Sequence, residues 1–429
     1  MSAELTRDVA FVFPLDLTAA QTQTCWRWAG TSRFVYNQTL ALSQDRHKAR
    51  QAEIAEHGRT DLKGLTSRNS LIPAFNSWKK QTQADPDTRD FSWLDDCSKF
   101  VREEAVVDAA RALGNWFDSM ARRRKGRKVG RPKFKKKNRA TPSFRLRQDS
   151  SGRGIRLTDD GCGLRLPVFG EVRLAQSPKR IRRLLARGRF VISAVTVSFR
   201  QGRWQISICG KAATFHCDRQ RHTKAGRARN TVPVGIDLGV RTQATIADAN
   251  GQVLAEIPGV KALQTQLKKL RRANKALSRT KKGSAGRRKA VAKVARAHAR
   301  IHHLRRDALH QITTELAQGH DLLVVEDLAV AAMLRSGRGA RGVSDQTFGE
   351  FRRQLVYKAD WYGSTVTVAD RWFPSSKTCS GCGDVNADLG RGQIRWTCPG
   401  CGVVHDRDVN AAVNLARWRP LDEGVQQAA

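Results

Sequence analysis

The chain has 429 residues, of which 78 are Lys or Arg and 39 are Asp or Glu, giving a formal net charge of +39. This excess of positive charge indicates a polyanionic partner, most simply nucleic acid. The hydrophobic share of 40% excludes a disordered basic tail. No apolar run is long enough to span a membrane and no signal-peptide pattern is present, so we expect neither a membrane nor a secreted protein.

The first hundred residues predict one strand followed by helix. Residues 8–17 are typical of a short strand ending in a turn, and residues 18–46 of a helix. Residues 47–97 are polar and mixed, and Pro73 and Pro86 act as breakers, so we expect irregular structure there.

The middle of the chain predicts a helix, a basic segment and a β-rich region. Apolar residues recur at helical spacing over 98–120. Residues 122–147 then hold 14 Lys or Arg and no acid. Short strands are expected over 153–210, the clearest being 191–199 and 203–210.

A new domain is predicted to begin near Thr231. Three apolar runs, 232–239, 242–249 and 252–257, predict three antiparallel strands. Asn250-Gly251 joins the last two, and this pair is favoured in hairpin turns because both turn positions need positive φ.

The rest of the chain alternates between helical and strand patterns. Residues 257–306 hold 17 Lys or Arg without an acid and are mostly helical in character. Further on, 321–328 and 364–370 predict strands, whereas 348–362 and 409–418 predict helices. The helical region that begins at 257 is expected to return to the core through an apolar stripe. This stripe is made of Ile301, Leu304, Ala308, Ile312 and Leu316.

Four of the nine cysteines form a C-x2-C-x15-C-x2-C pattern made of Cys379, Cys382, Cys398 and Cys401. Two such pairs on glycine-containing turns can surround one tetrahedral Zn²⁺, and four thiolates leave no open position, so the predicted zinc is structural. His405 is a weaker candidate ligand. The other cysteines are scattered singly, which is typical of a reducing compartment.

Three acids stand at the ends of predicted elements. Asp237 ends one apolar strand, Glu326 ends another, and Asp408 precedes the last helix. Carboxylates converging from distant parts of a chain can hold two divalent cations for phosphodiester chemistry. Each acid could instead cap a helix or pair with a base. The neighbouring Asp327 and Asp406 are expected to point elsewhere, with salt bridges as their role.

Several motifs occur in an order that resembles the TnpB family of RNA-guided DNA endonucleases, which insertion sequences encode and which are related to compact type V CRISPR effectors. The motifs are SRFVYNQTLAL (32–42), GRPKFKKK (130–137), GIDLG (235–239), VVEDL (324–328), FPSSKTCSGCG (373–383) and HDRDVNAAVNLA (405–416). Residues 43–97 show no such match, and Phe373-Pro374 departs from the usual Tyr or Thr before the ribbon.

The resemblance implies an α/β multidomain protein with an RNase H-like (RuvC) nuclease domain, in which two Mg²⁺ are held by Asp237, Glu326 and Asp408, with Asp237 bridging both. The implied domains are a wedge β-barrel at 1–20 and 122–225, a helical recognition domain at 21–121, the nuclease domain at 231–375 and 402–420 with a basic helical insert at 257–318, a zinc ribbon at 376–404 and a tail at 421–429.

The implied partners are a guide RNA and double-stranded target DNA, and the protein itself would recognise a short motif beside the target. A prokaryotic cytoplasmic location at the nucleoid and either a monomer or a homodimer per guide are expected. The candidate nucleic-acid contacts are Arg131, Lys133, Lys135, Lys268, Lys269, Arg271 and Arg272. Trp26, Trp28 and Phe75 are candidates for base stacking, although core packing is the commoner role of such residues.

Three alternatives to a guided nuclease stay open on the sequence. A repressor would bind guide and target without cutting, although the intact acids speak against it. A DNA-strand transferase would use three acids on the same fold. A zinc-ribbon protein that binds nucleic acid without chemistry would leave those acids unexplained.

Overall fold

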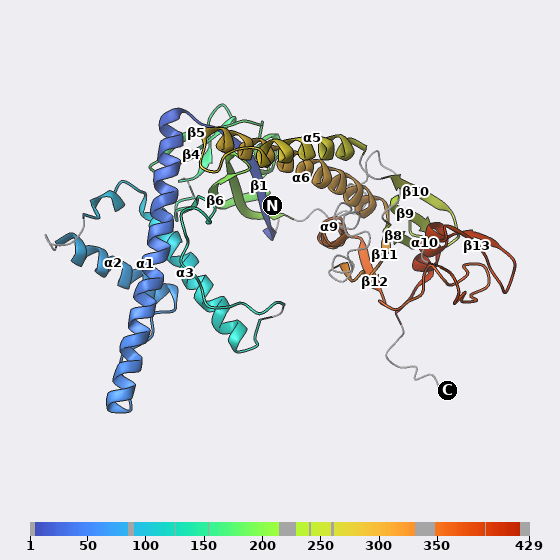
Figure 1. The fold of residues 1–429 in the computed structure, drawn as a ribbon, viewed down its shortest axis with the longest axis horizontal. Coiled ribbons are helices and arrows are strands. Elements are labelled where there is room, and N and C mark those ends of the chain that lie inside the picture. Colours follow the sequence, from blue (N-terminus) through green and yellow to red (C-terminus); the bar gives the residue numbers. More distant parts are fainter. Residues whose placement is uncertain are drawn as a thin grey trace. The chain divides into compact units, whose positions relative to one another are not determined.

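The structure is a computed structural model that describes residues 5–84, 90–124, 126–152, 154–213, 229–239, 242–258, 261–330, 348–390 and 392–420. The chain divides into two compact units, Met1–Ala213 and Thr214–Ala429 (Figure 1). Pro86, Cys217 and the tail at 421–429 lie outside the described residues.

The first unit contains a seven-stranded sheet with the order β2-β6-β7-β1-β5-β4-β3. Its strands are β1 (Leu5–Asp16), β2 (Ser143–Arg147), β3 (Arg156–Leu157), β4 (Gly163–Leu166), β5 (Gly170–Leu174), β6 (Phe190–Arg200) and β7 (Arg203–Ala213). Strand β1 pairs with β7 over most of its length and with β5 through Leu15 and Asp16, and both pairings are antiparallel. The predicted strands at 8–17, 191–199 and 203–210 are therefore confirmed.

Strands β6 and β7 form the longest hairpin of this sheet. Buried residues alternate along β7, as expected of a strand with one face on a core. Gln201 and Gly202 form the turn with φ of 57° and 82°. Positive φ at both turn positions matches the right-handed twist of the flanking strands.

Helices α1 (Ala19–His57), α2 (Arg68–Ala84) and α3 (Lys99–Met120) form the helical part of this unit, with a short 3₁₀ turn, η1 (Ser92–Leu94), before α3. A capping box of Thr18 and Gln21 starts α1, and Gly58 ends it in the left-handed conformation. The three helices share one core, which includes Val35, Leu40, Leu71, Phe75, Val106 and Ala109.

The expectation of irregular structure at 47–97 was wrong for 47–57 and 68–84, although 58–67 are irregular as expected. Helix α1 continues to His57, and α2 runs through Pro73. Proline removes one helical hydrogen bond, but Leu71 and Phe75 on either side of it are buried in the shared core, and tertiary packing outweighs the local preference. Helix α4 (Lys179–Ala186) was also missed, because only Ile181 and Leu184 mark its buried face among basic residues.

The second unit is built on a five-stranded sheet with the order β10-β9-β8-β11-β12. Its strands are β8 (Val234–Asp237), β9 (Thr242–Asp248), β10 (Val253–Pro258), β11 (Leu322–Glu326) and β12 (Thr365–Ala369). The first three strands pair antiparallel, as predicted, whereas β11 pairs in parallel with both β8 and β12. Strand β8 is thus the central strand.

The turn between β9 and β10 differs from its prediction in one respect. Gly251 has a φ of 92°, but Asn250 is not in the positive region. The Asp248 carboxylate instead accepts hydrogen bonds from the backbone N–H groups of Asn250 and Gln252, at 2.9 Å each. This side-chain cap replaces the second left-handed residue that the two-residue turn would need.

Helices α5 (Lys261–Ser278), α6 (Ala285–Gly319), α9 (Phe348–Tyr362) and α10 (Arg407–Arg417) complete the second unit, with a small hairpin of β13 (Arg395–Thr397) and β14 (Val404–Asp406). The predicted helical regions are confirmed, but the buried face of α6 matches the expected stripe only in part. Ile301, Leu309, Thr313 and Leu316 are buried, whereas Leu304, Ala308 and Ile312 are only partly buried.

A buried arginine joins three parts of the second unit. The Arg229 guanidinium lies 2.7 Å from the Asp321 carboxylate and donates to the carbonyl oxygen of Tyr362 at 2.7 Å and to that of His320. The ends of α6 and α9 therefore meet one cation, which is favourable because helix C-termini carry partial negative charge.

Among the described residues, no helix is long and apolar enough to cross a membrane.

Candidate active site and cysteine cluster

Two acids end neighbouring parallel strands in the second unit. Ile236 of β8 pairs with Val325 of β11, and Asp237 and Glu326 each follow by one residue. Residues in register on adjacent strands point to the same face of a sheet. The carboxylates of Asp237 and Glu326 therefore emerge together at one end of the sheet, and both side chains are partly exposed.

The third acid is brought to them by α10, which crosses β8 at Gly235. A Cβ on Gly235 would lie 2.0 Å from the Ala412 carbonyl oxygen and 2.4 Å from the Ala416 nitrogen, so only glycine permits this approach. Asp408 stands in the first turn of this helix. The close crossing explains how a residue 171 positions after Asp237 becomes its electrostatic neighbour.

The electrostatics of Asp237 show that it feels the charges of the other two acids. Burial raises the pKa of Asp237 well above its usual range, and the charges of Glu326 and Asp408 raise it further, against an opposing effect of Arg407. Burial also raises the pKa of Glu326, while the Ser375 hydroxyl and Arg407 oppose that shift. Carboxylates in this arrangement are destabilised as anions unless a cation joins them.

The predicted salt bridges are confirmed for Asp327 but not for Asp406, which has another role. Asp327 forms ion pairs with Arg352 and Arg371. Asp406 is the N-cap of α10, where its carboxylate accepts hydrogen bonds from the backbone N–H groups of Asp408 and Val409. The Asp406 cap therefore fixes the first turn of α10, which carries Asp408.

A polar network supports Glu326 from behind. The Ser375 hydroxyl donates to Glu326 Oε1 at 2.5 Å. The Asn414 amide of α10 donates to the carbonyl oxygens of Ser375 and Thr378, at 2.8 and 2.6 Å. Asn410 accepts from the Ser380 N–H at 2.9 Å and donates to the Thr378 carbonyl at 2.7 Å. Helix α10 thus fixes the segment that orients Glu326.

A cleft of about 480 Å³ opens beside Glu326. Its described walls include Leu238, Leu328, Phe348 and the guanidinium groups of Arg352 and Arg371. Each of these two arginines keeps about half of its side-chain surface exposed, 41% and 50%, while paired with Asp327. The cleft therefore presents cations next to the acids.

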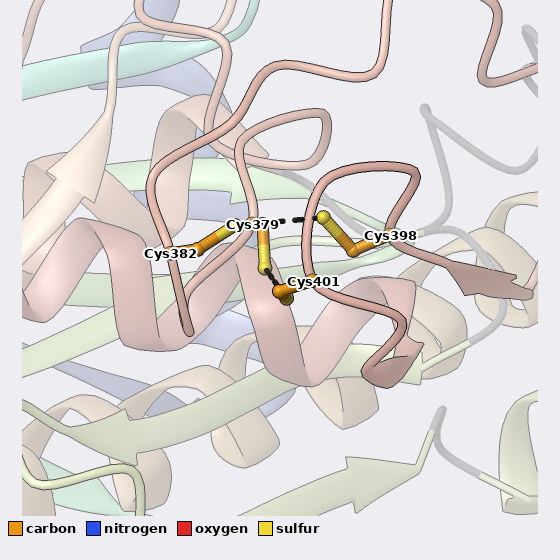
Figure 2. Close-up of side chains that lie close together, drawn as sticks. All are labelled: Cys379, Cys382, Cys398 and Cys401. Atoms are coloured by element: carbon orange, nitrogen blue, oxygen red, sulfur yellow. Dashed lines mark hydrogen bonds between the residues drawn. The ribbon is translucent and has the colours of Figure 1, made fainter.

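The four cysteines of the C-x2-C pairs converge, as predicted, with all four sulfur atoms within 4.8 Å of one another. Figure 2 shows the four side chains pointing toward one common centre from two loops. The sulfurs of Cys379 and Cys401 are 3.6 Å apart, as are those of Cys382 and Cys398. This spacing and donor set suit one tetrahedral Zn²⁺.

The two cysteine loops have the same backbone design. The N–H of Gly383 donates to the Cys379 carbonyl, and that of Gly402 to the Cys398 carbonyl, both at 2.9 Å. Both glycines have positive φ, 85° and 75°. His405 lies outside the four-thiol set and its Nε2 contacts the Cys379 sulfur at 3.0 Å. Burial opposes ionisation of Cys379, but hydrogen bonds from the Cys382 and Gly381 N–H groups and from His405 lower its pKa to about 6.

The cysteines outside this cluster that the structure describes, Cys25, Cys97, Cys162 and Cys209, are free thiols. Burial raises the pKa of Cys25 and of Cys97 to about 12. A thiol with such a pKa is unreactive at neutral pH. Among the described cysteines, the pattern is thus one four-thiol cluster and four single thiols, of which Cys25 and Cys97 are buried.

The candidate nucleic-acid contacts differ in their availability. Most of them are exposed, namely Arg131, Lys133, Lys268, Lys269, Arg271 and Arg272. Lys135 is partly buried, with its ammonium 3.7 Å from the centre of the Tyr36 ring. The final arginines of the basic segment are used within the fold, since Arg147 pairs with Glu103 at 2.5 Å and Arg145 with Glu104 at 3.4 Å.

The aromatic candidates are mostly packing residues. Trp28 and Phe75 are buried. Trp26 keeps 45% of its surface exposed but packs against Phe199 and Trp204.

Sequence reasoning missed four contributors to the site, namely Ser375, Arg407, Asn410 and Asn414. The signal that could have found the asparagines is their i, i+4 spacing on the last helix, among alanines and leucines of its inner face. Buried amides on a helix need partners. The partners here are the backbone groups of the segment before the cysteine cluster.

Comparisons with known proteins cover nearly the whole chain. Residues 216–337 match the family described as "Probable transposase" of the OrfB_IS605 type, residues 348–415 the Cas12f1-like TNB domain, and residues 7–52 a helix-turn-helix domain of the OrfB_IS605 type. In the structure that last range holds β1 and most of α1 rather than two helices.

Similar whole proteins and one solved structure carry related names. A Mycobacterium tuberculosis protein named as an RNA-guided DNA endonuclease is 37% identical over 415 residues, 95% of this chain and 86% of its own length. The Escherichia coli protein InsQ, named likewise, is 30% identical over 95% of this chain and 91% of its own length. A Cas12f1 complex with guide RNA and target DNA aligns with a TM-score of 0.57 at 13% identity, over 94% of this chain and 83% of the Cas12f1 chain, which shows a shared fold.

The order of motifs, the converging acids, the four-cysteine cluster and the extent of these matches agree: the chain belongs to the TnpB family of RNA-guided DNA endonucleases.

Proposed function

We propose that this chain is an RNA-guided DNA endonuclease that binds a guide RNA, recognises a short motif beside the target and cleaves DNA by hydrolysis at the Asp237–Glu326–Asp408 site. The observation that carries the proposal is the convergence of these carboxylates from β8, β11 and α10 at one end of a sheet. The names of the relatives support the guide RNA and the DNA substrate.

The second unit supports assignment to the RNase H-like (RuvC) fold. Three antiparallel strands followed by two parallel ones, with a helix packed on the central strand, carry the acids at the strand ends. The first unit supports a wedge domain formed by its sheet and a recognition domain formed by α1, α2 and α3. The proposed domain bounds are those that the family resemblance implies, as given in the sequence analysis.

The donor set of these acids suits divalent cations, whereas among the described residues only the four cysteines already lie close enough together to share one ion. Burial and mutual repulsion raise the pKa of Asp237, and oxygen ligands of this kind suit Mg²⁺. Asp237, Glu326 and Asp408 would hold two Mg²⁺, which supply activation of water and stabilisation of the leaving oxygen when bound.

The chain's own residues prepare this chemistry in three ways. Ser375 fixes one oxygen of Glu326 and leaves the other for ligation. Arg407, anchored on the carbonyl oxygen of Gly390 at 2.7 Å, places positive charge near Asp237 and Glu326. Arg352 and Arg371 line the adjacent cleft, where guanidinium groups can orient a phosphodiester.

The cysteine cluster would hold one structural Zn²⁺. Its loops are joined to α10 through Asn410 and to the Glu326 segment through Ser375. The metal would therefore stabilise the position of two site elements rather than take part in hydrolysis.

Guide and target would lie along the exposed Lys and Arg side chains named above as candidate nucleic-acid contacts. A guide–target duplex is recognised through its backbone charge and A-form shape, for which unpaired lysines and arginines are suited. A cytoplasmic, nucleoid-associated location and one or two copies per guide complete the proposal.

The test is to purify the protein from cells that also express its native flanking DNA, and to sequence any RNA that co-purifies. The complex is then incubated with Mg²⁺ and a plasmid library that carries the guide-matched sequence beside randomised bases. A discrete RNA and cleavage beside one short motif support the proposal.

Other outcomes would favour the alternatives. A discrete RNA with bound but uncut DNA would favour the repressor. Joined rather than hydrolysed DNA ends would favour the strand transferase. If no defined RNA co-purifies, the proposal of an RNA-guided protein is wrong.

A further inference from the structure

A cavity of about 220 Å³ lies in the helical part of the first unit, far along the sequence from the acids. Its walls are mostly apolar and are formed by α1, α3, the segment after α1 and the basic segment after α3. The residues used in the argument are Leu40, Gln44, Arg50, Trp116, Phe117 and Arg131.

Two aromatic rings form one wall of this cavity. Trp116 and Phe117 have ring centres 4.7 Å apart, and the Arg131 guanidinium lies over the Trp116 ring at 5.7 Å. Both rings are partly exposed. Flat aromatic surfaces beside an arginine are the surfaces on which unstacked bases are held.

Another part of the cavity wall supplies a hydrogen-bond donor. Arg50 Nε is buried and has no hydrogen-bond partner among the described residues. The guanidinium passes close to the backbone of Gly64, where an added Cβ would lie 3.3 Å from Arg50 Nη1. A buried donor without an acceptor is costly, and a ligand acceptor in the cavity would satisfy it.

The walls are fixed by specific contacts rather than by loose packing. The Ser43 hydroxyl donates to the Leu65 carbonyl at 2.6 Å, which holds the segment after α1 against the helix. Asn37 exchanges two hydrogen bonds with the backbone of Lys135, at 2.7 and 3.1 Å. The second pair holds the Gly-Arg-Pro segment in place, so that Arg131 and Pro132 border the cavity.

We propose that this cavity binds one unstacked nucleobase, with its ring against Trp116 and Phe117 and an acceptor atom of its edge on Arg50. The surrounding segment, 122–147, has 14 Lys or Arg residues and no acid, and would attract the phosphates attached to that nucleobase. Single-stranded RNA offers splayed bases more readily than a duplex does, so the guide RNA is the favoured source. The proposal rests on the guide-RNA part of the proposed function.

The test combines base removal with removal of the aromatic wall. Single abasic positions are introduced along the co-purifying RNA and, in a separate arm, along the target DNA. Binding is measured for the wild type and for Trp116→Leu, which keeps an apolar side chain. Trp361→Leu, in α9 of the second unit and outside the cavity, is the control, and Arg50→Gln is the second cavity variant.

In the wild type, we expect one position whose abasic form weakens binding by about tenfold or more. That penalty should disappear in Trp116→Leu, shrink in Arg50→Gln and persist in Trp361→Leu. If the only position whose penalty depends on Trp116 lies in the target DNA, the assignment of the bound nucleobase to the guide RNA is wrong.

If no position in either arm is coupled to Trp116 or Arg50 while the complex still binds RNA and cuts DNA, the cavity is not a base site. The proposed function would survive that result, whereas a protein that binds no RNA would refute the proposed function first.

Discussion

Gly235 of β8 and Ala412 of α10 are in such close contact that a Cβ on the glycine would lie 2.0 Å from the alanine carbonyl oxygen. This contact sets the distance between the strand that carries Asp237 and the helix that carries Asp408. The geometry of the acids therefore depends on a position with no chemistry of its own.

We predict that Gly235→Ala displaces α10, reduces DNA cleavage by about 100-fold or more and destabilises the fold by about 2–4 kcal/mol. Gly319→Ala is the control, because a Cβ there meets nothing within 4 Å. Cleavage assays and urea unfolding measure both effects. Equal losses in the two variants would show that the close crossing does not matter.

Removing one carboxylate should stabilise the metal-free protein. Burial and the charges of Glu326 and Asp408 disfavour the Asp237 anion, so we expect Asp237→Asn to raise the free energy of unfolding in EDTA by about 1–2 kcal/mol. Adding Mg²⁺ should raise the melting temperature of the wild type and have much less effect on the variant. A wild type that is insensitive to Mg²⁺ would contradict the assignment of the acids as its ligands.

Ser375 should act on cleavage and not on binding. Ser375→Ala removes the hydrogen bond to Glu326 Oε1, and we expect cleavage to slow by about tenfold with unchanged affinity for RNA and DNA. Ser380→Ala is the control, because Ser380 contacts Asn410 through its backbone N–H. An equal slowing in both variants would mean that Ser375 does not position Glu326.

The Arg229 network should contribute to stability. Its side chain is 6% exposed beside Asp321, so Arg229→Met leaves a poorly compensated carboxylate and should cost about 3–5 kcal/mol. Arg353→Met removes the exposed pair with Glu350 and should cost less than about 1 kcal/mol. Urea unfolding of both variants tests the difference.

His310 should make stability depend on pH. Burial, with the charges of Lys358 and Arg306, lowers its pKa from 6.5 to about 4, against an opposing effect of Glu350. Between those values the unfolded chain binds the proton and the folded chain does not, so stability falls as pH drops from 6.5 toward 4. His310→Gln should make that part of the stability profile less steep; an unchanged slope would rule His310 out.

The sequence predicted the elements that carry the acids because their patterns are local. Apolar runs ending in Asp237 and Glu326 are recognisable strands, and the cysteine spacing defines its own turns. The α1 extension and α2 were missed because they depend on contacts with α3, which outweigh Pro73. Local patterning could not show that interhelical packing.

The supporting residues were hidden for a related reason. Ser375 lies 49 positions after Glu326, and Asn414 lies 39 positions after Ser375. The spacing of Asn410 and Asn414 marks a polar stripe on α10, but it does not identify those distant partners. The cavity beside Trp116 is assembled from four segments, so only the folded chain reveals it.

The most direct test of the central claim is cleavage by the reconstituted complex of protein and guide RNA, comparing the wild type with Asp237→Asn at equal DNA occupancy. We predict Mg²⁺-dependent cutting of guide-matched plasmid by the wild type, and cutting at least about 100-fold slower by the variant with the same affinity for DNA. Cutting by the variant at the wild-type rate, or cutting by the wild type regardless of the guide sequence, would contradict the account.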